Sequence, residues 1–274
     1  MTVKTFARAY RNYIRSATAG GEQFGFDLEL VARIEPLLSL LYRQWWKVAL
    51  SGFEHLPAAG PALIAGNSGG TIPWPAFMLM YALMSSRSKP RRLSVLADLD
   101  WVADRKLRQA LAGVGFVART AENARRLFAA GEVVAIFPEG AAAASKPFAE
   151  RYRLRPFDWT LFLPAIEEDV PIYPLATLGC DEAVPVFANL EGLARFLRLP
   201  AYPVTPFFPW MPFPTNLMSL PVAWRMHLLR PASRPADQDR HGLDEVAQRQ
   251  AGFVEGEIQA ELNRMLRWRW KSQG

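Results

Sequence analysis

The chain has 274 residues, of which 50% are hydrophobic and 21% are charged. This composition excludes disorder over most of the length and predicts one large globular domain, with or without extensions. The formal net charge of +6 favours an anionic partner, such as a membrane surface or a phosphorylated substrate, whereas no motif supports nucleic-acid binding. The single cysteine, Cys180, excludes an internal disulfide framework, and its spacing from the three histidines predicts no metal site.

Residues 2–18 have the pattern of a basic amphipathic helix. Apolar side chains recur near one face of this helix and cations near another. Such a helix either lies on an anionic membrane surface or packs against its own domain with the basic face in water. The apolar positions are Val3, Phe6, Tyr10, Tyr13 and Ala17, and the cations are Lys4, Arg8, Arg11 and Arg15.

Strand and helix patterns then alternate along the chain. We expect strands at residues 47–56, 61–66, 91–98, 115–119, 132–137 and 171–179, and helices at 28–46, 76–84, 106–114, 121–131, 162–170 and 242–270. Pro36 is expected to bend or divide the first of these helices. The alternation predicts an α/β fold with a mixed sheet flanked by helices. We expect one α/β domain over residues 46–230, an N-terminal helical extension over 1–45, and a C-terminal helix with a basic tail over 231–274.

Two long stretches carry no charge, residues 56–86 and 201–224. Both contain several prolines, and the first also contains Asn67, Ser68 and Thr71, so neither predicts a continuous membrane-spanning helix. The cations near the start are not followed by an apolar core, so no signal peptide is expected. With the single cysteine, these features favour a reducing, cytoplasmic compartment.

The stretch "GNSGGTIPWPAF", residues 66–77, follows a short apolar run and allows several interpretations. It fits the G-x-S-x-G pattern of a hydrolase nucleophile elbow, in which Ser68 would use His227 or His241 as base and Asp181 as third member. Two prolines delay any helix after the serine, and only about two strands precede it, which argues against a hydrolase. The stretch also fits a tight glycine turn in which two backbone segments approach closely.

Three later segments, with this stretch, form an ordered set. They are "GVGFVAR" at 113–119, "FPEG" at 137–140 and "VPIYP" at 170–174. In this order the chain resembles the glycerolipid acyltransferases of the 1-acylglycerol-3-phosphate acyltransferase superfamily over about residues 24–230. The stretches "KPFAERYRLRPF" and "PAYPVTPFFPW" are similar to a bacterial branch of that family, whose first block reads "NHSG..PWDA".

The resemblance implies a glycerol-3-phosphate acyltransferase-like fold with an acyl-chain groove and a glycerophosphate pocket. It implies that no cofactor is needed and that acyl-CoA or acyl carrier protein is the acyl donor. Here Ser68 stands where the family has its histidine base, and Pro75 stands where it has the aspartate that supports the base. Serine is a poor base near neutral pH, and losing general-base catalysis costs about 10² to 10⁴ in rate. The resemblance therefore predicts a degenerate catalytic pair.

The substrate-binding residues that the resemblance implies are Arg119, Glu139, Gly140 and Lys146. Four alanines, 141–144, follow where the family has polar or cationic side chains, so phosphate capture would rest on Arg119, Lys146 and backbone amides. Glu139 either binds a polar headgroup or caps the turn after a buried strand. Arg119 either holds an anion or forms an ion pair with Glu139.

These expectations leave three functional hypotheses. The first is an acyltransferase-family protein with a degenerate site that binds lipid or an acyl thioester, peripheral at the cytoplasmic face of an anionic membrane. The second is an active acyltransferase that uses another route, such as an acyl-Ser68 intermediate, and the third is a serine esterase. The basic aromatic tail at 267–271 fits either an interfacial membrane anchor or a solvated terminus. The stretch "FFPWMPF" at 207–213 fits a membrane-touching or acyl-lining loop or core packing.

Overall fold

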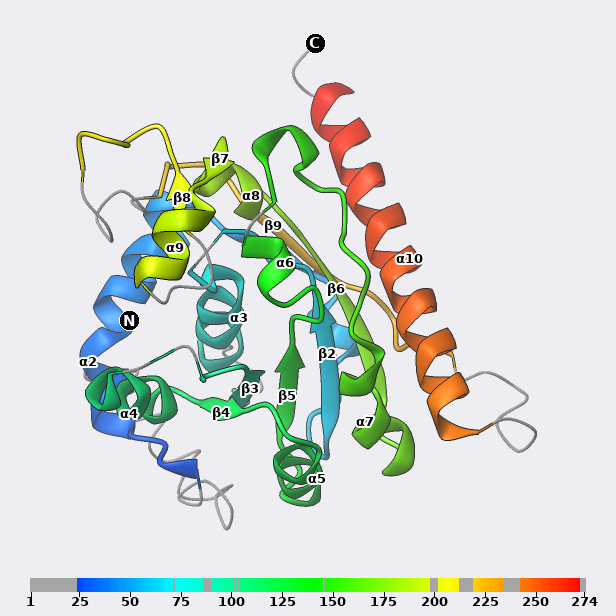
Figure 1. Cartoon of the computed structure of the whole chain (residues 1–274). Coiled ribbons are helices and arrows are strands. Elements are labelled where there is room, and N and C mark those ends of the chain that lie inside the picture. Colours follow the sequence, from blue (N-terminus) through cyan, green and yellow to red (C-terminus); the bar gives the residue numbers. More distant parts are fainter. Residues whose placement is uncertain are drawn as a thin grey trace.

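The computed structural model describes residues 24–70, 72–85, 90–100, 102, 104–144, 146–197, 202–211, 219–233 and 242–271. Among these residues, seven strands form one sheet with helices on both faces (Figure 1). The sheet order is β1-β9-β6-β2-β5-β3-β4, from strands β1 (Ala49–Ser51), β2 (Ala62–Gly66), β3 (Leu93–Ala97), β4 (Phe116–Ala118), β5 (Val133–Ile136), β6 (Ile172–Leu178) and β9 (Arg225–Leu228).

The sheet is mixed because one strand reverses direction. Strands β6, β2, β5, β3 and β4 are parallel to one another, as expected when helices connect successive strands. Strand β9 runs antiparallel to β6, and β1 runs parallel to β9 at the edge. In Figure 1 the parallel strands β2 and β5 both point towards the upper end of the molecule.

Side chains of the central strands alternate between two hydrophobic cores, which is the period of a strand. In β2, Ala62 and Ile64 enter the first core, whereas Leu63 and Ala65 enter the second. Strand β5 alternates in the same way, and all four of its residues are buried. Both faces are therefore covered, which explains why these strands read as continuous apolar runs.

Helices α2 (Leu28–Leu40), α3 (Trp74–Met84) and α4 (Arg105–Gly113) lie beside the first core, and helices α5 (Ala121–Ala129), α7 (Leu163–Glu167) and α10 (Leu243–Lys271) beside the second (Figure 1). Pro36 lies inside α2 without dividing it, and the helix continues into a π-helical turn, Leu41–Trp45. The next residue, Trp46, is fully buried and stacks on Trp224 at 4.6 Å between ring centroids.

Short elements connect these layers. The longest connection, after β6, holds α8 (Cys180–Ala183), α9 (Glu191–Leu197) and a two-stranded ribbon of β7 (Ala188–Asn189) and β8 (Pro203–Val204). The remaining elements are helix α6 (Ala141–Ala144) and three 3-10 turns, Phe53–His55, Phe148–Glu150 and Trp159–Leu161.

The prediction of a single α/β domain with a mixed sheet and flanking helices is confirmed. The C-terminal helix belongs to the core of the domain, because it buries Val254, Ile258 and Leu262 against the sheet. The expected helix at 2–18 lies outside the described residues, and the proposed domain boundaries stay a prediction. Within the described ranges, every helix is too short or too polar to cross a bilayer.

Candidate functional site

Two loops meet at the end of the sheet to which β2 and β5 point. The first loop, residues 66–70, begins at the last residue of β2, and the second, residues 137–140, follows β5. Because β2 and β5 are parallel neighbours with Ala65 opposite Ile136, their carboxyl ends bring these loops side by side. In open α/β sheets, this is the edge at which ligands bind.

Glu139 joins the two loops to a third segment. One of its carboxylate oxygens accepts a hydrogen bond from the backbone N–H of Ser68 at 3.3 Å, and the other accepts one from the N–H of Arg155 at 2.9 Å. Burial raises the pKa of this carboxyl, against the opposing effects of Lys146 and of these two N–H groups. Glu139 thus holds neighbouring loops together rather than capping only its own turn.

Lys146 lies between two acidic side chains and is buried with them. Its ammonium nitrogen is 3.1 Å from Asp181 Oδ2 and 3.8 Å from Glu139 Oε2, and its side chain is only 2% exposed. Burial opposes the charge of Lys146, but the two carboxylates outweigh that effect and raise its pKa. The lysine is therefore a cation whose charge two carboxylates already balance.

Asp181 fixes the path of the glycine-rich loop. Its Oδ2 accepts a hydrogen bond from the N–H of Tyr152 at 2.7 Å. A Cβ at Gly69 would lie 2.1 Å from Asp181 Oδ1, so only glycine fits there. Asn67, fully buried, exchanges hydrogen bonds of 2.7 and 3.0 Å with the backbone of Thr177. The close approach of backbone segments that the glycine pattern predicts is thus present.

Arg119 follows β4 and reaches the same edge. Its guanidinium bonds to Asp158 Oδ2 at 3.2 Å, and the N–H of Asp158 bonds to the carbonyl of Pro138 at 3.0 Å. The alternative of an Arg119–Glu139 ion pair is therefore wrong, because Asp158 takes that position. Gly140 has φ +57 and lies in open space, which suits a glycine in a left-handed turn.

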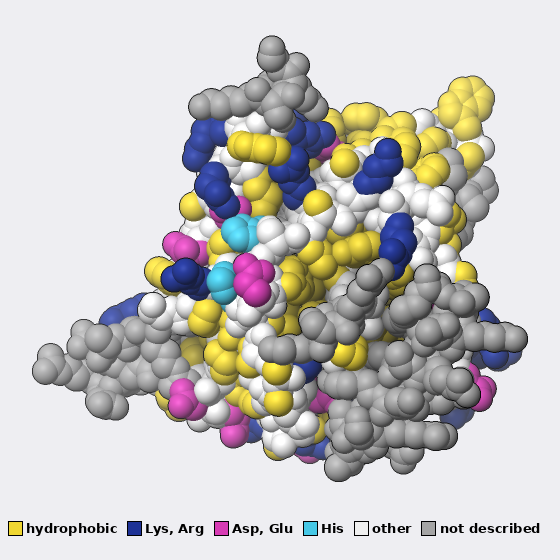
Figure 2. Space-filling view, turned by 180° about the vertical axis from the view of Figure 1, so that it is seen from behind, with side chains coloured by type: hydrophobic (Ala, Val, Ile, Leu, Met, Phe, Trp, Pro, Cys, Tyr) yellow, Lys and Arg dark blue, Asp and Glu magenta, His cyan; other side chains and the backbone are white. Residues whose placement is uncertain are grey.

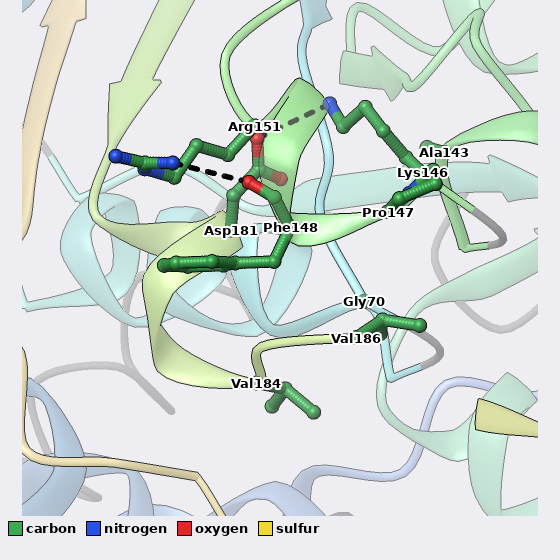
Figure 3. A pocket seen from close by; sticks show the side chains of 9 residues that line it. All are labelled: Gly70, Ala143, Lys146, Pro147, Phe148, Arg151, Asp181, Val184 and Val186. Atoms are coloured by element: carbon green, nitrogen blue, oxygen red, sulfur yellow. Dashed lines mark hydrogen bonds and ion pairs between the residues drawn. The ribbon is translucent and has the colours of Figure 1, made fainter. Parts of the chain in front are cut away.

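A cavity adjoins the buried charges (Figure 3). Its volume is only about 10 Å³, roughly the space that one water molecule occupies. Figure 3 shows the dashed contacts between Lys146 and Asp181 and between Arg151 and the carbonyl of Phe148 beside it. The lining residues are Gly70, Ala143, Lys146, Pro147, Phe148, Arg151, Asp181, Val184 and Val186.

Known proteins share the sequence pattern and the fold of this chain. The model of the family described as Acyltransferase matches residues 47–178, which include both site loops and Lys146. This part of the chain belongs to the acyltransferase superfamily.

The acyltransferase domain has uncharacterized relatives in mycobacteria. Proteins of Mycobacterium bovis and Mycobacterium tuberculosis are each 34% identical over 224 residues, which cover 80% of this chain and 62% of theirs. This chain therefore spans less than two thirds of the length of those relatives. The crystal structure of the 1-acyl-sn-glycerophosphate (LPA) acyltransferase PlsC from Thermotoga maritima has a similar fold, with a TM-score of 0.53 and 14% identity, over 86% of this chain and 80% of that one.

Among the described residues, no base is hydrogen-bonded to the hydroxyl of Ser68. The hydrogen bond of Ser68 to Glu139 uses the backbone amide. His227 Nδ1 pairs with Glu261 at 2.7 Å, His55 lies 3.9 Å from Glu54, and His241 is outside the described residues. Pro75 is buried at the second position of α3.

The sequence interpretation missed several residues of this site. The sequence suggests Asp181 only as a member of a hydrolase triad, whereas the structure pairs it with Lys146. The sequence does not single out Tyr152 or Asp158 as site residues. The hydroxyl of Tyr152 accepts a hydrogen bond from the N–H of Gly179 at 2.8 Å. For Asp181 a signal was available, because it follows Gly179 at the carboxyl end of a buried strand, as Glu139 follows β5.

Proposed function

We propose that this protein is a glycerolipid acyltransferase-family member that binds lipid or an acyl thioester at a degenerate site. One observation carries the proposal. The loops at 66–70 and 137–140 remain tied by the Ser68–Glu139 hydrogen bond, while the position of the family base is a serine without a bonded histidine among the described residues. A framework without its base binds substrates but transfers acyl groups slowly.

We propose an acyl thioester, either acyl-CoA or acyl carrier protein, as the acyl donor and a lipid as the second ligand, because the acyltransferase family match covers both site loops. Lys146 is already paired with two carboxylates, so we assign phosphate recognition first to Arg119, whose side chain is 34% exposed. Its partner Asp158, itself 37% exposed, would have to release it for a phosphate. We propose that the protein works at the cytoplasmic face of an anionic membrane, and the net charge of +6 supports this location.

Restoring the catalytic pair tests the proposal. We expect the double variant Ser68→His, Pro75→Asp to transfer acyl groups from acyl-CoA to lysophosphatidic acid about 10²-fold faster than the parent, because a general base supplies about 10² to 10⁴ in rate. An aspartate at the second position of α3 is also favoured by the helix dipole. Either single change should increase the rate of acyl transfer only slightly, since the histidine base and its supporting aspartate act as a unit.

The variant Ser68→Ala, Pro75→Ala is the matched control, and palmitoyl-CoA binding by calorimetry measures the unreacted complex of each protein. The parent should bind palmitoyl-CoA without consuming it. No gain in the double variant would show that erosion extends beyond the pair. Rapid turnover by the parent, or a stoichiometric adduct on Ser68 after treatment with a fluorophosphonate or acyl-CoA, would contradict the degenerate site and favour the acyl-Ser68 or esterase hypotheses.

A further inference from the structure

The long connection after β6 presents large apolar side chains to solvent. Among the described residues, Trp210 and Phe196 are the two most exposed large hydrophobic side chains, at 85% and 82%. Phe187 and Leu190 are exposed as well, on either side of β7. Several exposed large apolar side chains in one segment make that segment a candidate interaction surface. We call residues 184–211, as far as they are described, the aromatic module.

The aromatic module is built against the candidate site. Its Val184 and Val186 line the small cavity together with Gly70 and Lys146. The N–H of Phe148 bonds to the carbonyl of Val186 at 2.7 Å, and the rings of Phe148 and Phe187 lie 6.3 Å apart. A binding partner in contact with Phe187 would therefore lie next to the loop that contains Ser68.

Cations accompany the aromatic side chains at this end of the molecule. Arg195 is exposed next to Phe196, and exposed Arg151 lies over the ring of Phe148 at 4.5 Å. The carboxyl end of α10, with exposed Arg267 and Trp268, reaches the same end (Figure 1). Figure 2 shows yellow side chains over the upper part of the molecule with dark blue ones among them.

We propose that the aromatic module, together with the carboxyl end of α10, docks this protein on an anionic lipid bilayer, with the candidate site turned towards the lipid. The inference rests on the proposed function and adds the surface through which the protein reaches its lipid. Aromatic side chains insert at the boundary between headgroups and acyl chains, and arginines pair with anionic headgroups.

A bilayer fits this surface better than a second copy of the chain. Phe187, Phe196 and Trp210 lie on a strand end, a helix and a turn, and the latter two protrude almost fully into solvent. Separate protruding side chains can each enter a fluid layer, whereas a stable protein interface needs a continuous, complementary surface. The neighbouring arginines match a negative surface and would repel those of a second copy.

Vesicle flotation tests the docking surface. The variant Phe196→Ser, Trp210→Ser removes the two protruding side chains, and Leu107→Ser, Phe253→Ser is the matched control, since Leu107 and Phe253 are 49% and 48% exposed on α4 and α10. On phosphatidylcholine vesicles with about 30% phosphatidylglycerol, we expect the first variant to bind about 10- to 100-fold more weakly than the parent. The control should bind like the parent, and raising salt from about 0.05 to about 0.5 M should weaken binding of both.

Two results would overturn the docking surface. One is equal binding of the two double variants, and the other is a concentration-dependent dimer of the parent in sedimentation that only Phe196→Ser, Trp210→Ser abolishes. Octanoyl-CoA binding without vesicles separates this inference from the proposed function. The first variant should bind octanoyl-CoA like the parent. If neither binds it while vesicle docking persists, the proposed function fails and the docking surface stands.

Discussion

Lys146 lies between Asp181 and Glu139 with its side chain almost fully buried. A buried ion pair adds little net stability compared with apolar packing, but removing one partner leaves an uncompensated buried charge. Here one ammonium balances two carboxylates, so the lysine is the partner whose loss matters most. Its position between the loops makes it a structural cation of the site.

The variant Lys146→Met should therefore lower the free energy of unfolding by about 3–5 kcal/mol. Adding Asp181→Asn should recover part of this loss, because the second change removes one of the two unpaired carboxylates while keeping an acceptor for Tyr152. Chemical denaturation of the parent and both variants measures the difference. If Lys146→Met is as stable as the parent, the buried cluster is not charged in the folded state.

The sequence predicts the role of a residue only where the residue type itself sets the local backbone, as glycine does. Gly69 lies in a loop that approaches Asp181 closely, and Gly140 lies in a turn, as the glycine pattern indicates. Arg155, one partner of Glu139, and Asp158, the partner of Arg119, both come from the segment at 151–158, which follows the "FPEG" block. Sequence periodicity does not predict which oxygen bonds to which nitrogen across such loops. Those bonds depend on how the whole segment folds back against the loops.

At the scale of elements, α10 is fixed to the sheet by a polar contact as well as by its apolar face. Glu261 accepts hydrogen bonds from Arg264 and pairs with His227 of β9 at 2.7 Å. Burial opposes ionisation of Glu261, but these hydrogen bonds outweigh it and lower the pKa of the carboxyl from its ordinary value. A lowered carboxyl pKa contributes stability above the unfolded-state value and loses it as the pH falls through the folded-state value.

The variant Glu261→Gln should thus be less stable than the parent by about 1–2 kcal/mol at neutral pH, given the exposed Arg264 partner. The difference should shrink as the pH falls below about 4.5. Thermal unfolding between about pH 7 and pH 3.5 measures it. Glu257→Gln, an exposed change on the same helix, serves as control, and a difference that grows in acid would contradict the assignment.

The order of the main elements was predictable because buried strands and amphipathic helices carry their own patterns. Strands β2, β3, β5 and β6 all lie within the predicted ranges. The β7–β8 ribbon and β9 were not predicted, since two-residue strands leave no period and β9 follows a proline-rich stretch. The antiparallel place of β9 depends on partners far away in the chain, which local patterns do not identify.

At the scale of the whole molecule, α10 is part of the hydrophobic core. It buries Val246, Val254, Ile258 and Leu262 in the second core, and each such side chain contributes about 1.5–3 kcal/mol. The sum, about 6–12 kcal/mol, is as large as the stability of a typical domain. A chain that ends at residue 241 should therefore fail to unfold cooperatively in circular dichroism, and a cooperative transition like that of the parent would contradict this.

The place of β9 between β1 and β6 also sets an order of events on the ribosome. The ring nitrogen of Trp46 bonds to the carbonyl of Leu220, 174 positions later. At about 5–20 residues per second, synthesis separates these two residues by about 10 to 35 s. During this interval β1 lacks its partner strand β9, and the ring of Trp46 lacks Trp224. A chaperone that recognises apolar nascent chain can therefore bind at this edge of the sheet until residues 220–228 have been synthesised.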